Sequence, residues 1–254
     1  MFFSKDEADI DALVKDMEQE FELKFENDMA GFLGVDIVKH KNDSIEMTQT
    51  GLIERALKLC NMEGCDMKKT PSDGAPLVAD EAGTPRRESH LWNHRSAVGS
   101  SMCLVGNARP DIACAVHVAA RHSHHPKAIH EEGVKHICGH SQGTKDKGVV
   151  FTPSKDFALD ACVDADFEGS HGHEDSSDPI SIKSGTGFVV SFCGCPIIWS
   201  SKMQSTIALS TVQAECTALS TAMRELTPLR TTVKEVLENL DQECAGAKIC
   251  STVF

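Results

Sequence analysis

The sequence predicts an α+β protein, with helices through the middle of the chain and strands in its last third. Two observations predict this class. Apolar residues recur at helical spacing near the N-terminus and in several middle segments, whereas after residue 148 they form short runs separated by glycine, serine and aspartate. With 254 residues, 41% of them hydrophobic, the chain can bury a core in one or two domains.

The first half contains the clearest helix, over residues 9–21, where apolar side chains fall at i, i+3, i+4, i+7 and i+11. Two strands, 31–38 and 45–47, should flank a polar turn at 41–44. The stretch 70–90 holds three prolines and two glycines and reads as a linker or long loop. Further helices are expected over 51–62, 93–107, 110–122 and 126–140.

The turn cluster 143–148 is the candidate domain boundary, and strands are expected after it at 157–163, 184–193 and 195–200. Ser210 can cap the next helix, with Gln213 completing a capping box. Thr227-Pro228 should end this helix and start another, and the residues from Lys248 to Phe254 suggest a last, frayed strand. The apolar face of the capped helix is predicted to carry Val212, Cys216, Leu219, Met223 and Leu226.

Charge is distributed unevenly in this acidic chain, whose net charge is -13. Residues 1–28 contribute -7, whereas residues 86–148 carry +4 and nine of the twelve histidines. If the chain binds a phosphate backbone, residues 86–148 are therefore the expected contact. The eleven cysteines include no Cys-x-x-Cys and are expected to be reduced and mostly buried. Neither a signal-peptide core nor a membrane-length apolar run occurs, which favours a cytoplasmic or nuclear location and no membrane partner.

Acidic residues cluster where a strand ends and where a helix begins. Asp164 ends the predicted strand, Asp166 and Glu168 follow it, and Glu215 lies in the first turns of the capped helix. Oxygen ligands of this kind suit Mg2+, and phosphodiester cleavage by metal ions needs several carboxylates around one point. Acids at such positions also commonly stabilise helix starts or remain solvated, so spacing alone leaves both interpretations open.

The histidine-rich stretch allows a second hypothesis, a zinc site. His136 and His140 are four residues apart on a predicted helix, a spacing that zinc ligands can use. No His-Glu-x-x-His occurs, and nearby basic residues instead favour a partly solvated basic surface. The possible ligands are His117, His122, His124, His125, His130, His136 and His140, with Cys114 and Cys138. A serine hydrolase is excluded by local context, because no Gly-x-Ser-x-Gly follows a strand.

Read together, several segments resemble the Pol polyprotein of copia-type retrotransposons, from the C-terminal part of reverse transcriptase into RNase H. Each segment is short, and their order and spacing over nearly the whole chain carry the resemblance. The segments are Phe32–Ile37, His94–Ser100, Ala108–Ala113, His125–Pro126, Gly143–Phe151, Val163–Phe167, Lys183–Phe188, Trp199–Gln204 and Ser210–Leu219.

The resemblance implies three regions: a reverse transcriptase palm-end and thumb remnant over 1–75, a connection over 76–150, and an incomplete, C-terminally truncated RNase H-like α/β domain over 151–254. It also implies that Asp164 and Glu215 are catalytic ligands of Mg2+ or Mn2+ and that RNA/DNA hybrid is the partner, beside the remainder of a Pol polyprotein. The expected nucleic-acid-binding residues are Arg95, Arg109, Arg121, Lys127 and Lys135.

Departures from the family pattern predict a degenerate protein that is inactive as encoded. The paired polymerase aspartates would lie upstream of Phe2, and Ser251-Thr252 stand where the third RNase H aspartate is expected. The chain has no tyrosine, and His94, His140 and Cys216 stand where relatives typically carry one. Two of four ligands make a poor metal cage. The alternative is a non-catalytic binding or interaction remnant, or a His/Cys metal-binding protein.

Overall fold

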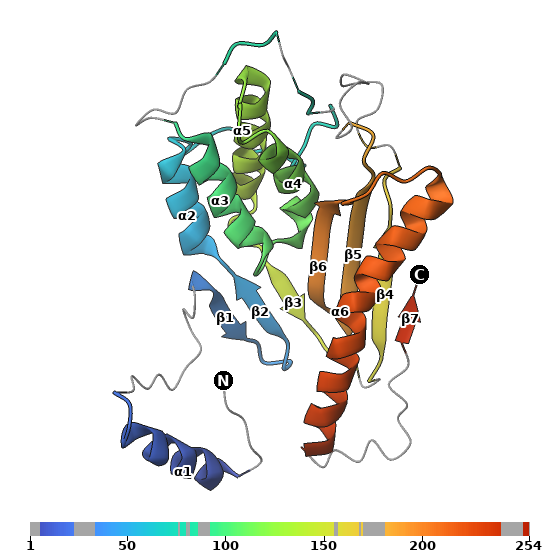
Figure 1. Cartoon of the computed structure of the whole chain (residues 1–254). Helices are drawn as coiled ribbons and strands as arrows, with labels where there is room; N and C mark the ends of the chain where they lie inside the picture. Colours follow the sequence, from blue (N-terminus) through green and yellow to red (C-terminus); the bar gives the residue numbers. More distant parts are fainter. Residues whose placement is uncertain are drawn as a thin grey trace.

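A computed structural model describes residues 6–22, 34–75, 77–79, 82–85, 92–154, 157–167, 169, 181–239 and 251–253. Its elements form two small sheets, a layer of four helices, one long helix and a short helix near the N-terminus (Figure 1). The expected mixture of helices and strands is confirmed. Within the described residues, no helix has the length and apolar character needed to cross a bilayer.

The first sheet contains β1 (Asp36–Lys39), β2 (Ile45–Thr48) and β3 (Val149–Phe151), antiparallel in that order. The turn between β1 and β2 was predicted, and Asp43 adopts a φ of 62° there, a left-handed conformation that aspartate tolerates. The predicted strand at 31–38 is confirmed from residue 36, and 31–33 lie outside the described residues. Strand β3 was not predicted, because three residues are too few to show a period.

The predicted helices form within a few residues of the expected bounds. They are α1 (Glu7–Glu18), capped by the Asp6 carboxylate, α2 (Thr50–Leu59), α3 (His94–Val105), α4 (Ala113–Arg121) and α5 (Ala128–Gly143), with a 3-10 turn, η2 (Pro110–Ile112), before α4. Helices α2 to α5 share one apolar core, which includes Ile53, Leu57, Val98, Leu104, Ile112, Val116, Val134 and Ile137. Burial of these side chains removes apolar surface from water and so stabilises the helical layer.

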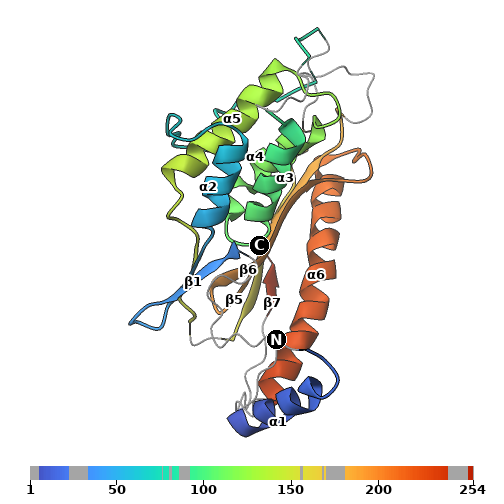
Figure 2. The same ribbon diagram turned by 90° about the vertical axis from the view of Figure 1, so that its left-hand side faces the viewer.

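The second sheet has the order β6-β5-β4-β7, from β4 (Leu159–Asp164), β5 (Gly185–Phe192), β6 (Cys195–Met203) and β7 (Ser251–Val253). The first three strands are antiparallel, as predicted, and β7 runs parallel to β4. Positive φ angles at Cys193 and Gly194 make the tight hairpin between β5 and β6. Helix α6 (Thr211–Asn239) covers one face, and α3 and α4 lie on the other side (Figure 2).

The buried face of α6 differs from the prediction. The buried residues of α6 are Ala214, Ala218, Ala222, Leu226 and Leu237, and Ala222 and Leu226 pack in the core of the second sheet. Leu226 was predicted and is confirmed. The large apolar side chains predicted to be buried are instead exposed, at 69% for Val212, 41% for Leu219 and 40% for Met223. Small alanine side chains let the helix axis approach the sheet closely. Periodicity weighted by side-chain size therefore selected the wrong face.

The predicted helix break at Thr227-Pro228 is also wrong. Helix α6 runs without interruption across Pro228, although the proline ring removes one N–H from its ladder. Leu226 is buried against the sheet before the proline, and Leu229 packs on the same core after it. Burial on both sides holds the helix continuous against the local preference.

Candidate functional site

A pocket of about 640 Å³ lies between α4 and the second sheet, at the end of β4. The predicted acid Asp164 and its neighbour Asp166 both line it. Register places Asp164 opposite Gly187 on β5, and Cys162 opposite Val189, which itself pairs with Trp199. Because side chains alternate across a strand, these residues share the sheet face that is turned away from α6. The indole nitrogen of Trp199 donates to the Val105 carbonyl of α3 at 2.6 Å, which fixes this face against the helical layer.

Two glycines leave space around the acids. The Gly185 N–H donates to the Asp166 carbonyl at 2.8 Å, and a Cβ on Gly185 would stand 3.4 Å from the Cβ of Asp166. A Cβ on Gly187, opposite Asp164, would meet no atom within 4 Å. The predicted strand entry at 185–187 therefore keeps the region beside both carboxylates open.

Glu215 is positioned by a capped helix start. Ser210 Oγ accepts from the Gln213 N–H at 3.2 Å, as predicted, while Gln213 Oε1 accepts from the Leu209 N–H at 2.8 Å, one residue earlier than a capping box requires. Gln204 donates to both the Ala214 carbonyl and Thr186 Oγ1, which ties the first turn of α6 to the start of β5. Glu215 is exposed at this same end of the sheet and does not line the pocket.

The described side chains do not assemble a metal site. Among the residues that the structure describes, no three histidine, cysteine, aspartate or glutamate side chains come together closely enough to hold an ion. Asp164 and Asp166 share a pocket, but Glu215 is not joined to them in a set of three. Magnesium is usually held by one or two carboxylates together with waters and substrate oxygens, so Asp164 and Asp166 could supply part of such a site, but the described residues form no cage of protein ligands.

The α4 wall of the pocket carries His117 and Arg121. Burial disfavours the imidazolium of His117, and the positive charge of Arg121 adds to this, so the pKa of His117 lies below its usual value. His117 is therefore neutral at pH 7. The cation of this wall is Arg121, one of the residues predicted to bind nucleic acid.

Three other predicted basic residues connect parts of the helical layer. Arg95 Nε donates to the Ser123 carbonyl at 3.1 Å, and Lys127 Nζ donates to the Gly83 carbonyl at 3.2 Å. Lys135 forms an ion pair with Glu131 and stands 5.5 Å from the centre of the Trp92 ring. Their binding to nucleic acid stays a prediction.

Arg109 requires a correction, because its side chain is buried with 2% exposure. Its Nε and Nη2 donate to the two carboxylate oxygens of Asp111 at 2.8 and 2.7 Å, and Nη1 and Nη2 donate to the carbonyl and hydroxyl oxygens of Thr144. His140 Nε2 contacts the same Asp111 carboxylate at 3.0 Å. A guanidinium enclosed in this way cannot face a phosphate backbone. Its role is to join η2 to the end of α5.

The pKa of Asp111 records the same network. Burial raises the pKa of this carboxyl, but the hydrogen bonds and charge of Arg109, with a further contribution from His140, outweigh burial and hold it below the usual value. Asp111 is therefore ionised at neutral pH. The ion pair links an exposed carboxylate to a buried cation.

The histidines act as anchors for the loop that precedes α3. His122 Nε2 meets the Leu77 carbonyl at 3.1 Å, and His130 Nε2 meets the Val78 carbonyl at 2.8 Å. Their rings stack at 4.1 Å, and His130 Nδ1 accepts from the Lys127 N–H, which leaves the proton on Nε2. No sequence pattern predicts these contacts, because each histidine and its carbonyl partner lie 45 and 52 residues apart, respectively.

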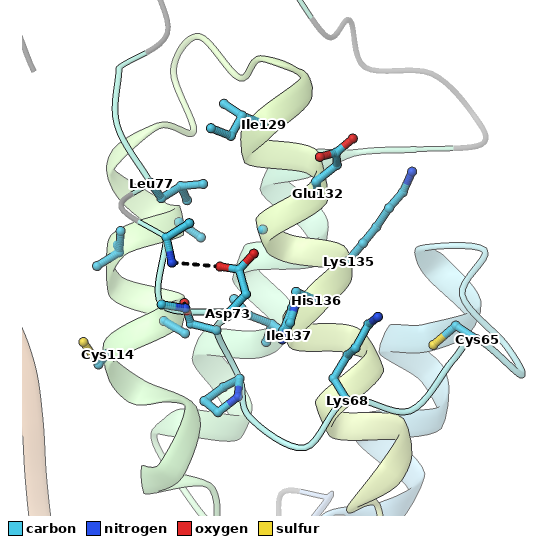
Figure 3. A pocket seen from close by; sticks show the side chains of 18 of the residues that line it. Cys65, Lys68, Asp73, Leu77, Cys114, Ile129, Glu132, Lys135, His136 and Ile137 are labelled. Atoms are coloured by element: carbon cyan, nitrogen blue, oxygen red, sulfur yellow. Dashed lines mark hydrogen bonds between the residues drawn. The ribbon is translucent and has the colours of Figure 1, made fainter. Parts of the chain in front are cut away.

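A second pocket, of about 680 Å³, lies between the segment 65–77 and helices α4 and α5 (Figure 3). Its wall mixes Lys68, Lys135 and His136 with Asp73 and Glu132, and Asp73 Oδ1 accepts from the Ala75 N–H at 3.0 Å. None of the predicted catalytic acids reaches this pocket. The candidate site is therefore built on the pocket at the end of β4.

The fold and the pocket at the end of β4 define a mixed helix-and-strand protein in which acids at a strand end face Arg121 of a helix. The chain is 33% identical over 224 residues to the retrovirus-related Pol polyprotein from transposon TNT 1-94 of Nicotiana tabacum. It is 28% and 29% identical over 199 residues to the Pol polyproteins from transposons RE2 and RE1 of Arabidopsis thaliana. No family model matches the chain, and no solved structure matches it.

The homologues of this chain are copia-type retrotransposon Pol polyproteins, and the resemblance seen in its sequence is confirmed. The matches cover 85% of the chain for TNT 1-94 and 78% for RE2 and RE1. They cover 16% of the tobacco protein and 13% of each Arabidopsis protein. The chain is thus related to one part of a much larger polyprotein.

Proposed function

We propose that this chain corresponds to the reverse transcriptase–RNase H part of a copia-type Pol polyprotein and that its second half binds RNA/DNA hybrid. The order of elements supports the proposal: three antiparallel strands, a helix over one face, and a fourth strand parallel to the first. In a sheet of this kind, residues at the strand ends lie together at one end of the sheet, where a nucleic acid can reach them.

One observation carries the proposal. Asp164 and Asp166 line a pocket together with Arg121 and Lys183, so cations stand beside the acids there. In a chain with a net charge of -13, cations at this pocket are the feature that would favour a phosphate group there. The acids then lie beside the bound backbone, where a metal-dependent nuclease would need them.

We assign no cleavage step to the chain. A divalent cation would supply charge neutralisation at the scissile phosphate when bound, and Asp164 and Glu215 are the proposed Mg2+ or Mn2+ ligands. Asp164 and Glu215 belong to no group of three possible ligands among the described residues, and we propose a degenerate, inactive domain that binds hybrid without cleaving it. A His/Cys metal-binding role has less support, because His122, His130 and His140 each hydrogen-bond within the protein.

Fluorescence anisotropy with a labelled RNA/DNA hybrid tests binding, and gel analysis of the same hybrid with Mg2+ or Mn2+ tests cleavage. The chain should bind with an affinity that falls as salt rises, and it should release no product. In EDTA, Asp164→Asn should bind more tightly than the wild type, because a carboxylate facing a phosphate is removed. The matched control is Asp36→Asn, an exposed carboxylate on β1 in the other sheet, which should change little.

Absence of hybrid binding would refute the proposed function. Cleavage that Asp164→Asn and Glu215→Gln abolish would refute the inactive assignment and show instead that the chain completes a working metal site. Equal effects of Asp164→Asn and Asp36→Asn would place the hybrid elsewhere on the surface.

A further inference from the structure

We infer that the pocket between α4 and the second sheet holds one unpaired nucleotide of a strand, with its phosphate at Arg121 and Lys183 and its base on the apolar floor formed by β5 and β6. The inference rests on the proposed function, since it names the part of a nucleic acid that the same site takes. It assigns recognition to residues from both halves of the chain.

The size of the pocket selects the ligand. Its volume of about 640 Å³ lies in the range of sites that enclose one small organic molecule. A single nucleotide fits such a volume, whereas a double helix is far too wide to enter it. The nucleotide must therefore be unpaired, either at the end of a strand or free in solution.

The floor of the pocket offers apolar contact. Val189 and Trp199 are cross-strand neighbours on the face turned away from α6, and Val118 of α4 also lines the pocket. Val189 is 38% exposed, although it lies on a central strand. The Trp199 ring cannot turn freely, because its nitrogen is bound to the Val105 carbonyl. A rigid apolar surface left open to solvent suits the flat face of a base.

The charges of the pocket place the phosphate. Arg121 stands on α4 and Lys183 precedes β5, so cations approach from two elements. Asp164 and Asp166 would repel a phosphate at the end of β4, which directs it toward these cations. Neutral His117, beside Arg121, can hydrogen-bond to a ribose or phosphate oxygen without adding charge.

Calorimetric titration of the full chain in EDTA tests the inference, with 5′-AMP, adenosine and inorganic phosphate as probes. AMP should bind at least about tenfold more tightly than either part alone, because base and phosphate contacts act together. An oligoadenylate with a free end should displace AMP readily, whereas a blunt hybrid duplex, of which only the backbone reaches the mouth of the pocket, should displace it less effectively. If AMP binds but oligoadenylate does not displace it, the pocket takes free nucleotides, and the strand part of the inference fails.

Variants locate the site. Arg121→Gln and Lys183→Gln should each weaken AMP binding about tenfold, the effect of losing one charge-assisted hydrogen bond. Arg224→Gln, which removes an equal charge from the exposed side of α6, should leave AMP affinity unchanged. Val189→Glu puts a charge on the exposed floor and should abolish binding, and circular dichroism should show the wild-type fold in each variant.

AMP affinity no greater than that of phosphate, or equal loss with Arg224→Gln and Arg121→Gln, would overturn the inference. These outcomes differ from failure of the proposed function. If the hybrid binds but AMP does not, the function stands without this pocket, whereas AMP binding with no hybrid binding keeps the pocket and removes the function.

Discussion

The buried ion pair of Arg109 gives the sharpest test of how the first half is held together. Asp111→Ala removes both carboxylate oxygens that accept from the guanidinium, at 2.8 and 2.7 Å, and the contact with His140. Arg109, which is 2% exposed in the wild type, then keeps its hydrogen bonds with the two Thr144 oxygens but loses its anionic partner. An uncompensated buried cation is much more costly than the loss of an exposed ion pair.

We expect Asp111→Ala to lower the free energy of unfolding by about 3 kcal/mol, the low end of the range for breaking a buried pair. The low end applies because Asp111 itself is 46% exposed and the Thr144 oxygens still accept from Arg109. The double variant Arg109→Met/Asp111→Ala should be more stable than Asp111→Ala, since the uncompensated charge is gone and the methionine fills apolar space.

Urea unfolding followed by circular dichroism measures these differences, with Asp146→Asn, an exposed acid on the same half, as the control. Hybrid binding of Arg109→Met provides the functional comparison, made well below its unfolding midpoint. A variant that folds as stably as the wild type but loses affinity for hybrid would contradict the structural role and restore Arg109 to the nucleic-acid surface. Equal stability of the single and double variants would show that the pair is not coupled.

Three further predictions concern pH, packing and helix continuity. The pKa of Asp111 is lowered on folding, so its contribution to stability is complete above the unfolded pKa of about 3.9 and is lost as pH falls through the lower folded pKa. The stability difference between wild type and Asp111→Asn should therefore shrink below about pH 4 in acid-unfolding curves. A Cβ on Gly139 would lie 2.7 Å from the Asp66 carbonyl oxygen, so Gly139→Ala should cost about 2 kcal/mol in urea unfolding, whereas Gly99→Ala, with open space in α3, should stabilise by up to about 1 kcal/mol. Pro228→Ala should raise stability by about 1 to 3 kcal/mol by restoring a helical N–H, and a loss of stability would contradict this reasoning.

The candidate site shows which inferences local sequence can support. Asp164 was placed at a strand end by its neighbours, and Ser210 was identified as a helix cap, because both depend on a few adjacent residues. The α4 wall of the pocket could not be predicted. Arg121 and Asp164 stand 43 residues apart in the sequence, and only the packing of the helical layer on the second sheet brings them to one cavity.

The histidine-rich stretch shows the same limit. Its composition alone allowed either a metal site or a partly solvated basic surface, and neither interpretation placed the imidazoles against backbone carbonyls. In the structure, His122 and His130 hydrogen-bond to backbone carbonyl groups of the loop before α3. The sequence predicted this loop only as an irregular segment. A backbone carbonyl carries no residue-specific signal, so such partners cannot be found from residue types.

The sequence by itself determined the class of elements, their order, the capped start of α6 and the relation to retrotransposon Pol polyproteins. Periodicity, turn chemistry and short matching segments are all local properties of a chain. Tertiary structure decided which face of α6 is buried, that α6 crosses Pro228, and that Arg109 is enclosed while Arg121 lines a pocket. These outcomes depend on how closely two surfaces can approach and on which charges the packed layers leave in contact with water. Both are set by residues distant in the sequence, and burial free energy outweighs the local preferences that the sequence displays.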